Sequence, residues 1–200
     1  LEQQLLSIES LGKHYIVARS FPRGKESDYV RILAAYDDTT VTTDPPVMAC
    51  NLDLGEWCEF EANTDVEIIS NLPIMVGQFL AAEQAPEPNI DGYMQEGDAR
   101  IGDPAFILGV PVEQYRADYV FLAPNKYERD YVNIIAPLDA QVELDYALLP
   151  DALFTRVASS DFKSGRFPIS DGFHSVSISQ PGAIIVYGYD QYVSYGYPGG

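Results

Sequence analysis

The amino-acid sequence predicts an all-β protein built from two tandem, internally repeated antiparallel β-sandwich units. Three observations carry this prediction: the two halves of the chain resemble each other, apolar residues follow the period of strands, and a capped helical stripe is missing. The chain has 200 residues, of which 46% are hydrophobic. That is enough for two units of about 100 residues, each with a packed core.

The internal repeat emerges when the first half is shifted forward by about a hundred residues. The longest match sets Tyr-Val-Arg-Ile-Leu-Ala at residues 29–34 against Tyr-Val-Asn-Ile-Ile-Ala at residues 131–136. The other matches are Ile8-Glu9 with Val112-Glu113, Tyr15-Ile16 with Tyr119-Val120, and Val66-Glu67-Ile68 with Val176-Ser177-Ile178. The offset drifts by a few residues along the chain, as expected when insertions gather in loops.

The first unit reads as short strands separated by turn-forming residues. Residues 29–35 and the β-branched run 39–43 lie on either side of Asp37-Asp38, a natural turn. A helical interpretation of residues 1–11 fails, because the matching segment contains Pro111 and proline favours an extended chain. The next expected strands cover 66–70 and 74–81, with Asn71-Leu72-Pro73 between them.

The second unit repeats this plan with one long insertion. Its expected strands include 131–136, 175–179 and 183–189, the last two separated by Gln180-Pro181-Gly182. A long loop is expected over residues 148–171.

The segment between the two units is rich in proline, glycine and acidic residues, which is typical of a loop. We place the boundary there, so that residues 1–96 form the first β-sandwich repeat with its junction loop and residues 97–200 the second. Carboxylates in this segment are a candidate calcium site, because Ca²⁺ prefers oxygen ligands. A solvated acidic loop and no cofactor is the alternative, since the spacing does not match an EF-hand. The residues concerned are Asp91, Glu96, Asp98 and Asp103.

Cys50 and Cys58 are the only two cysteines. If they face each other across a hairpin, Asp53-Leu54-Gly55 forms a three-residue loop with glycine at the position that favours a left-handed conformation. Opposed positions bring Cα atoms within disulfide range. The alternative is a pair of reduced cysteines on the inner face. A disulfide would indicate an oxidising compartment.

The formal net charge of −18 argues against nucleic-acid binding, because such a surface repels phosphate backbones. No stretch approaches the ~18 apolar residues that a membrane span requires, so we expect no membrane insertion.

Catalytic interpretations find little support. Ser10 and His14 could be joined to an aspartate as a triad, but no nucleophile-elbow motif accompanies them. We expect His14 and His174, the only histidines, to be surface or structural residues. Carboxylate pairs for a hydrolase arise by chance in a chain with 30 acidic residues.

Several segments resemble a known family. The resemblance lies in Gly102-Asp103-Pro104-Ala105-Phe106, residues 110–115, residues 130–137, the ending from Tyr187 to Gly200, and residues 72–79 of the first unit. Together these segments resemble the N-terminal domain of the IgGFc-binding protein, in the form found in large secreted bacterial proteins. The resemblance covers essentially the whole chain. It implies secretion or display at the cell surface, and non-covalent binding without a catalytic motif.

The tyrosine-rich ending contains two groups of residues. We expect Tyr187 and Tyr189 to pack in the structure, because they share one face of a strand. Tyr192, Tyr195 and Tyr197 are candidate contact residues for a sugar ring or a protein surface. The leading hypothesis is therefore a non-enzymatic extracellular adhesion module with a protein or glycan ligand. The alternatives are a structural spacer in a long surface protein and a hydrolase.

Overall fold

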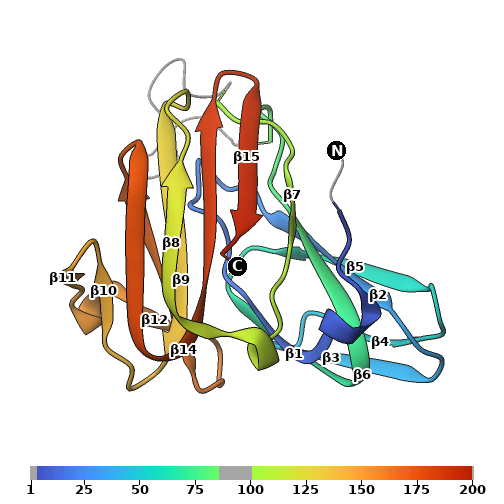
Figure 1. Cartoon of the computed structure of the whole chain (residues 1–200). Helices are drawn as coiled ribbons and strands as arrows, with labels where there is room; N and C mark the ends of the chain where they lie inside the picture. The colour runs from blue at the N-terminus through green and yellow to red at the C-terminus, as the bar shows by residue number, and fades with distance from the viewer. Residues whose placement is uncertain (1–3, 86–100, 200) are drawn as a thin grey trace.

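The computed structural model describes residues 4–85 and 101–199. Almost all of its regular structure is β, as predicted, and two antiparallel sheets lie side by side, the first blue to green and the second yellow to red (Figure 1). No helix among the described residues has the length and apolar character of a membrane span.

The elements of the first half are η1 (Ile8–Ser10), β1 (Gly12–Val17), β2 (Asp28–Ala34), β3 (Thr39–Asp44), β4 (Ala49–Leu52), β5 (Trp57–Ala62), β6 (Val66–Phe79) and β7 (Phe106–Leu108). Those of the second half are η3 (Val112–Gln114), β8 (Arg116–Ala123), β9 (Arg129–Pro137), β10 (Val142–Leu144), β11 (Ala147–Leu148), η4 (Asp151–Leu153), β12 (Thr155–Arg156), β13 (Phe162–Ile169), β14 (Gly172–Asp190) and β15 (Val193–Pro198).

One long strand in each half serves both layers of its sandwich. The first part of β6, residues 66–70, pairs with β1 and β3, whereas residues 74–79 pair with β2 and β7. The prediction of two separate strands in each half was therefore wrong. Asn71-Leu72-Pro73 and Gln180-Pro181-Gly182 lie inside β6 and β14. The chain passes from one layer to the other there, and proline is tolerated where a ladder is interrupted.

The core of the first half lies between these layers. Its largest buried members come from both of them, for example Tyr15 of β1 and Ile32 of β2, which are 1% and 0% exposed. The second half repeats the arrangement, with β8 and β10 on the first part of β14 and β9 and β15 on the second.

Two tyrosines show how closely the halves correspond. Tyr15 donates a hydrogen bond to the carbonyl of Ile74 at 2.6 Å, and its hydroxyl accepts one from the Gly12 amide at 3.1 Å. Tyr119 makes the same two bonds at 2.7 and 3.1 Å, to Gly182 and from Arg116. Strand pairing also shifts one predicted match by two residues. Tyr15 pairs with Ile68 and Tyr119 with Val176, so Ile68, rather than Val66, corresponds to Val176.

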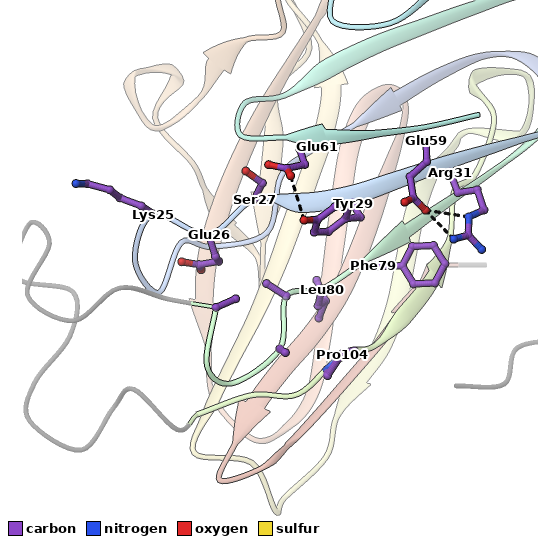
Figure 2. Close-up of a pocket in the computed structure, with 13 residues that line it drawn as sticks. Lys25, Glu26, Ser27, Tyr29, Arg31, Glu59, Glu61, Phe79, Leu80 and Pro104 are labelled. Atoms are coloured by element: carbon purple, nitrogen blue, oxygen red, sulfur yellow. Dashed lines mark hydrogen bonds and ion pairs between the residues drawn. The ribbon is translucent and has the colours of Figure 1, made fainter. Parts of the chain in front are cut away.

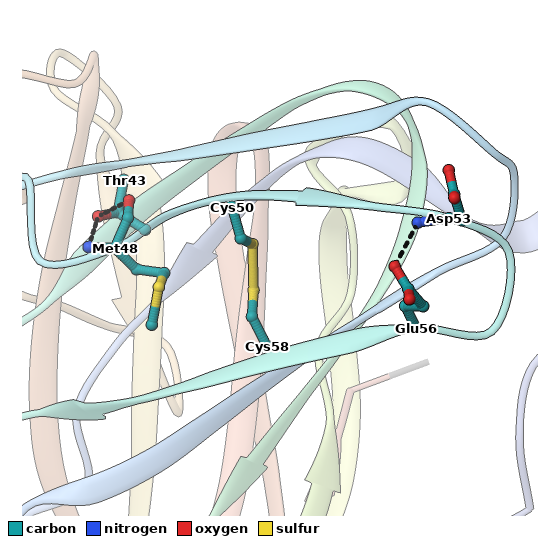
Figure 3. Close-up of a disulfide and its surroundings, with 6 residues drawn as sticks. All are labelled: Thr43, Met48, Cys50, Asp53, Glu56 and Cys58. Atoms are coloured by element: carbon teal, nitrogen blue, oxygen red, sulfur yellow. Dashed lines mark hydrogen bonds between the residues drawn. A yellow bond between two sulfur atoms is a disulfide. The ribbon is translucent and has the colours of Figure 1, made fainter.

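The predicted disulfide between Cys50 and Cys58 is present, with a Cα–Cα distance of 6.8 Å (Figure 3). The expected paired hairpin was wrong, because β4 and β5 lie at opposite ends of the strand order β4-β3-β6-β2-β5. The turn between them does place Gly55 at a φ of 81°, where glycine is favoured. The bond therefore joins the two layers at the open side of the sandwich.

The second half closes the same side with an insertion. Phe154 packs against Phe167 with ring centroids 5.3 Å apart, and Leu149 and Phe154 both contact the core. The long loop expected over residues 148–171 was wrong in its last part. Strand β13 lies there and pairs along its length with β9.

The two halves are joined by continuous packing. One apolar cluster combines Ile16 of β1 and Ala18, just after this strand, with Ile135 and Ala183 of the second sheet. Strand β7 lies beyond the expected boundary at residues 96/97, yet it pairs with β6 of the first sheet. Strand pairing therefore favours a division between β7 and η3, and the division into units stays a prediction.

Candidate functional site

The outward face of β2 is where the first half departs most from an ordinary polar surface. Val30 and Ile32 point into the core and are 0% exposed, as their alternation predicts. Tyr29, Arg31 and Leu33 therefore point outward, and Tyr29 is 43% exposed. The face that should be solvated thus carries an aromatic and an aliphatic side chain on either side of an arginine.

Strand β5 extends this face on one side. Leu33 pairs with Trp57, Arg31 with Glu59, and Tyr29 with Glu61. The guanidinium of Arg31 lies 4.5 Å from the centre of the Trp57 ring, and its Nη2 contacts Oε2 of Glu59 at 2.7 Å. Cross-strand pairs of this kind hold side chains in a fixed arrangement. Trp57 is nevertheless 54% exposed, which is unusual for the largest apolar side chain.

Strands β6 and β7 extend the face on the other side. Arg31 pairs with Gly77, which has no side chain, and the ring of Phe106 fills that space. A Cβ at Gly77 would collide with this ring. Phe106 stacks on Phe79 with centroids 4.7 Å apart, and Arg31 lies 5.2 Å from the Phe79 ring. Arg31 therefore lies between two aromatic groups, in a cation–π arrangement on each side.

We call this surface the aromatic face. It consists of Tyr29, Arg31, Leu33, Trp57, Met75, Phe79 and Phe106.

Two adjoining grooves hollow the aromatic face. One, with a volume of about 550 Å³, lies between Tyr29, Arg31 and the segment Leu80–Ala82, and carries Glu59 and Glu61 at its rim (Figure 2). The Tyr29 hydroxyl donates to Glu61 at 3.0 Å, and this carboxylate raises the pKa of Tyr29. The other groove, of about 380 Å³, is more apolar and lies beside Trp57. Together they offer apolar area, a guanidinium and carboxylates within one surface.

Such a surface is suited to recognition. Aromatic side chains and arginine are enriched where proteins contact partners, and exposed aromatic rings also stack on sugars. None of the seven residues of the aromatic face is a histidine, serine or cysteine, although Ser27, Glu59 and Glu61 line the adjoining groove.

Carboxylates gather in another groove, of about 520 Å³, in the second half. Asp130 and Asp171 both line it. Burial and the charge of Asp171 raise the pKa of Asp130, and the hydrogen bond from the Tyr195 hydroxyl opposes them. A raised pKa beside a second carboxylate occurs in acid–base catalysis. Asp130 is, however, 4% exposed and bound to Tyr195, which favours a structural role.

Among the tyrosines of the ending, one pair is buried as the sequence predicted. Tyr187 and Tyr189 are each 1% exposed, so their structural role is confirmed. Tyr195 and Tyr197 pack partly against the second core, and their hydroxyls donate to Asp130 and to the Leu122 carbonyl. Tyr192 is 47% exposed and lies at the turn between β14 and β15. Tyr195 and Tyr197 stack on each other with ring centroids 6.1 Å apart, and the binding role of the three candidate contact residues stays a prediction.

The two histidines occupy structural positions. His14 Nε2 lies 2.8 Å from Oε1 of Glu67, while Ser10 contacts Ser7 instead, so no triad forms. His174 is 8% exposed and faces two acceptors, Asp145 at Nδ1 and the Ser170 carbonyl at Nε2, each at 2.7 Å.

The calcium hypothesis falls mainly outside the described residues, where Asp91, Glu96 and Asp98 lie. Asp103 is described, and its amide donates to the Ser194 hydroxyl at 2.8 Å. Within residues 4–85 and 101–199, no group of three or more acidic, histidine or cysteine side chains is placed to hold a metal ion.

The sequence interpretation missed the aromatic face. Its signal was the alternation of Tyr29, Arg31 and Leu33 with Val30 and Ile32, opposite the only tryptophan of the chain. A strand with apolar residues on both faces does not by itself reveal which face is exposed.

A family model described as IgGFc binding protein matches residues 1–188. No curated protein matches the chain. Among solved structures, a Pleurotus ostreatus lectin in complex with GalNAc is 11% identical at a TM-score of 0.25, over 93% of this chain and 75% of that one. A Streptomyces avermitilis alpha-L-rhamnosidase complexed with L-rhamnose is 9% identical at a TM-score of 0.27, over 96% of this chain and 26% of that one. Both TM-scores are below 0.5, so these likenesses carry no argument about function.

Proposed function

The chain belongs to the IgGFc binding protein family, and from this membership we propose that it is a non-enzymatic extracellular module that binds a protein or a glycan through the aromatic face. The observation that carries the proposal is Trp57, which is 54% exposed and stacked on Arg31 at 4.5 Å. A rigid aromatic group held by a charged neighbour loses little conformational entropy when a partner binds it.

The charge of the chain makes this face distinctive. The net charge is −18, whereas Arg31 places a guanidinium at the centre of the aromatic face. Arg31 is paired with Glu59, so the face is close to neutral and apolar on an otherwise acidic molecule. A neutral apolar patch on a charged surface is the usual mark of an interaction site.

An extracellular location is supported by the disulfide between Cys50 and Cys58. Disulfides persist in oxidising compartments and are rare in the cytosol. Family membership points the same way, and we propose that the chain acts in a secreted or surface-displayed protein.

Two alternatives make different predictions. The ending with Tyr192, Tyr195 and Tyr197 is a rival contact surface, although the last two hydroxyls are already bonded within the chain. A structural spacer would have no contact surface, and substitution of Trp57 would then change nothing.

The test is solid-phase binding of the chain to mucins, host and bacterial glycans, and immunoglobulin including its Fc fragment. We expect saturable binding to at least one of them, weakened about tenfold or more by Trp57→Ala, since aromatic anchors dominate interfaces. Tyr146→Ala is the matched control, because Tyr146 is 90% exposed and belongs to the other half of the chain.

Tyr192→Ala separates the two surfaces. Weakening by this variant alone would transfer the contact site to the ending of the chain. Absence of binding across the whole panel would favour the spacer.

A further inference from the structure

The aromatic face has an equivalent in the second half, and that equivalent is buried. Strand pairing matches Tyr29 with Tyr131, because Tyr29 pairs with Phe79 and Tyr131 with Tyr187. Tyr131 and Tyr187 are 7% and 1% exposed, against 43% for Tyr29. Along β9 almost every residue is buried, whereas burial alternates along β2.

The first half covers this equivalent surface with the outer side of β1 and the segment after it. Ile16 and Ala18 pack against Ile135 and Ala183. These contacts join the outer side of one layer in the first half to the outer side of the other layer in the second.

Polar contacts fix this internal interface. The Asn133 side chain donates to the carbonyl of Arg19 at 2.9 Å. Asp65 accepts from both Arg166 and Ser164. Side chains of the second half thus bind two parts of the first half. One is the backbone just after β1, at Arg19, and the other is the carboxylate of Asp65, just before β6.

The covering surface also has an equivalent, and it is exposed. Ile16 pairs with Glu67 and Val120 with Ser175, so Val120 occupies the place of Ile16. Val120 is 80% exposed, and Leu122, in the place of Ala18, is 48% exposed. We call Val120, Leu122 and Phe173 the β8 face. Phe173 is 82% exposed and pairs with Leu122 across the strands.

Each chain therefore presents both partners of an interface that it already forms internally. We propose that the aromatic face of one copy binds the β8 face of a second copy, head to tail, in the manner of the internal interface. This inference rests on the proposed function, because it names the protein partner of the same surface.

The side chains at equivalent positions are complementary. Trp57 occupies the place of Ser164 and Phe173 the place of Asp65, so the polar pair of the internal interface becomes an aromatic pair between copies. Arg31 occupies the place of Asn133, from which its guanidinium can donate to the backbone carbonyls after Val120.

The two surfaces differ, so the contact is heterologous. An assembly of bound copies therefore keeps a free aromatic face at one end and a free β8 face at the other. Association therefore produces chains of increasing length. Copies of net charge −18 repel one another, and added salt screens that repulsion. We expect self-association to be stronger at 0.5 M than at 0.05 M sodium chloride.

The experiment is sedimentation equilibrium of the whole chain across a concentration series at both salt concentrations. Trp57→Asp disables the aromatic face and Val120→Asp the β8 face, and both side chains are exposed, so neither change disturbs a core. Tyr146→Asp is the control of equal charge. Phe173→Asp is a second variant of the β8 face, and circular dichroism checks that all four fold.

The expected result is a mass that rises with concentration for the wild type and the control, and association at least about tenfold weaker for each face variant alone. An equimolar mixture of Trp57→Asp and Val120→Asp should form a 1:1 dimer and stop, because each supplies the surface that the other lacks.

A wild-type chain that stays monomeric at about 1 mM, or variants that fail to complement each other, would overturn the proposal. The ligand panel distinguishes the two levels: monomeric protein that still binds a ligand through Trp57 overturns only the self-association. A chain that neither self-associates nor binds a ligand of the panel would overturn the proposed function as well.

Discussion

Val120 occupies in the second half the position that Ile16 occupies in the first, yet Ile16 is 4% exposed and Val120 is 80% exposed. The difference has a single cause, since the second half covers Ile16 and no described residue covers Val120 in the same way. When two similar halves of one chain pack against each other in this way, each half keeps one surface that has no partner within the chain. The aromatic face is the unmatched surface of the first half.

The two equivalent tyrosines should contribute equally to stability. Tyr15→Phe and Tyr119→Phe each remove a hydroxyl that bonds one backbone amide and one carbonyl. We expect each to lower the free energy of unfolding by about 1–3 kcal/mol, because a buried donor and acceptor lose their partner. Denaturant titration measures both. A large effect at one position and none at the other would contradict the equivalence.

The ion pair between the halves should matter more than the one on the aromatic face. Asp65→Ala leaves Arg166, Ser164 and the Arg19 amide without their acceptor, and we expect a loss of about 2–4 kcal/mol. Glu59→Ala breaks an exposed pair with Arg31 and should cost less than about 1 kcal/mol. If Asp65→Ala and Glu59→Ala lower the free energy of unfolding equally in denaturant titration, Asp65 does not contribute to stability as a buried ion pair between the halves.

Reduction of the disulfide should destabilise the chain. The bond closes a short loop of eight residues' separation, for which chain entropy predicts about 2–3 kcal/mol. Guanidinium unfolding of the oxidised chain, the reduced chain and the double variant Cys50→Ser/Cys58→Ser measures this. Unchanged midpoints would show that the bond adds no stability, and free-thiol titration confirms its oxidation state.

The pair of His174 and Asp145 predicts a pH dependence of stability. Burial lowers the pKa of His174, but the acceptors Asp145 and Ser170 outweigh it, so that this pKa is raised. The contribution of His174 is therefore complete below its unfolded pKa of ~6.5, and is lost as pH rises through the higher folded value.

Asp145 gives the opposite pH dependence, in which stability is lost at low pH. Burial raises its pKa, but hydrogen bonds from His174 and the Ser175 amide outweigh it, so the net pKa is lowered. Its contribution is complete above ~3.9 and is lost as pH falls. We expect the melting temperature of the wild type to fall as pH rises above ~6.5, and that of His174→Gln to fall less. Parallel melting curves for the two proteins would refute the pairing.

The strands that the sequence predicted include β2, which has one buried face, and β9, which is buried on both faces. Both were recognised as short runs of β-forming residues bounded by turn formers, and the alternation of burial along β2 emerges only in the structure. Strand β13 lies in a predicted loop, because its sequence Phe-Lys-Ser-Gly-Arg-Phe-Pro-Ile carries charged residues, glycine and proline where a strand is expected to carry an apolar or alternating run. Cys50 and Cys58 were paired correctly for a geometric reason that was wrong, since opposed hairpin strands and opposed sandwich layers both bring side chains together.

The candidate site was harder to predict for a related reason. The tyrosine-rich ending attracts attention by composition, but Tyr187 and Tyr189 fill the space between the halves. The aromatic face is assembled from four strands that are distant in the sequence, and Arg31 is placed between Trp57 and Phe79 only by strand order. Composition identifies such residues, whereas strand order decides which of them are exposed.

The most direct test of the aromatic face uses the intrinsic fluorescence of Trp57, because it is the only tryptophan in the chain. Its emission reports on this face alone, and acrylamide quenching measures its exposure. In the free chain at low concentration we expect efficient quenching. When any partner binds saturably, be it a second copy, a protein or a glycan, the emission should shift to shorter wavelength and the quenching constant should fall along the same binding curve. A partner that saturates the chain while both signals stay unchanged would contradict the account.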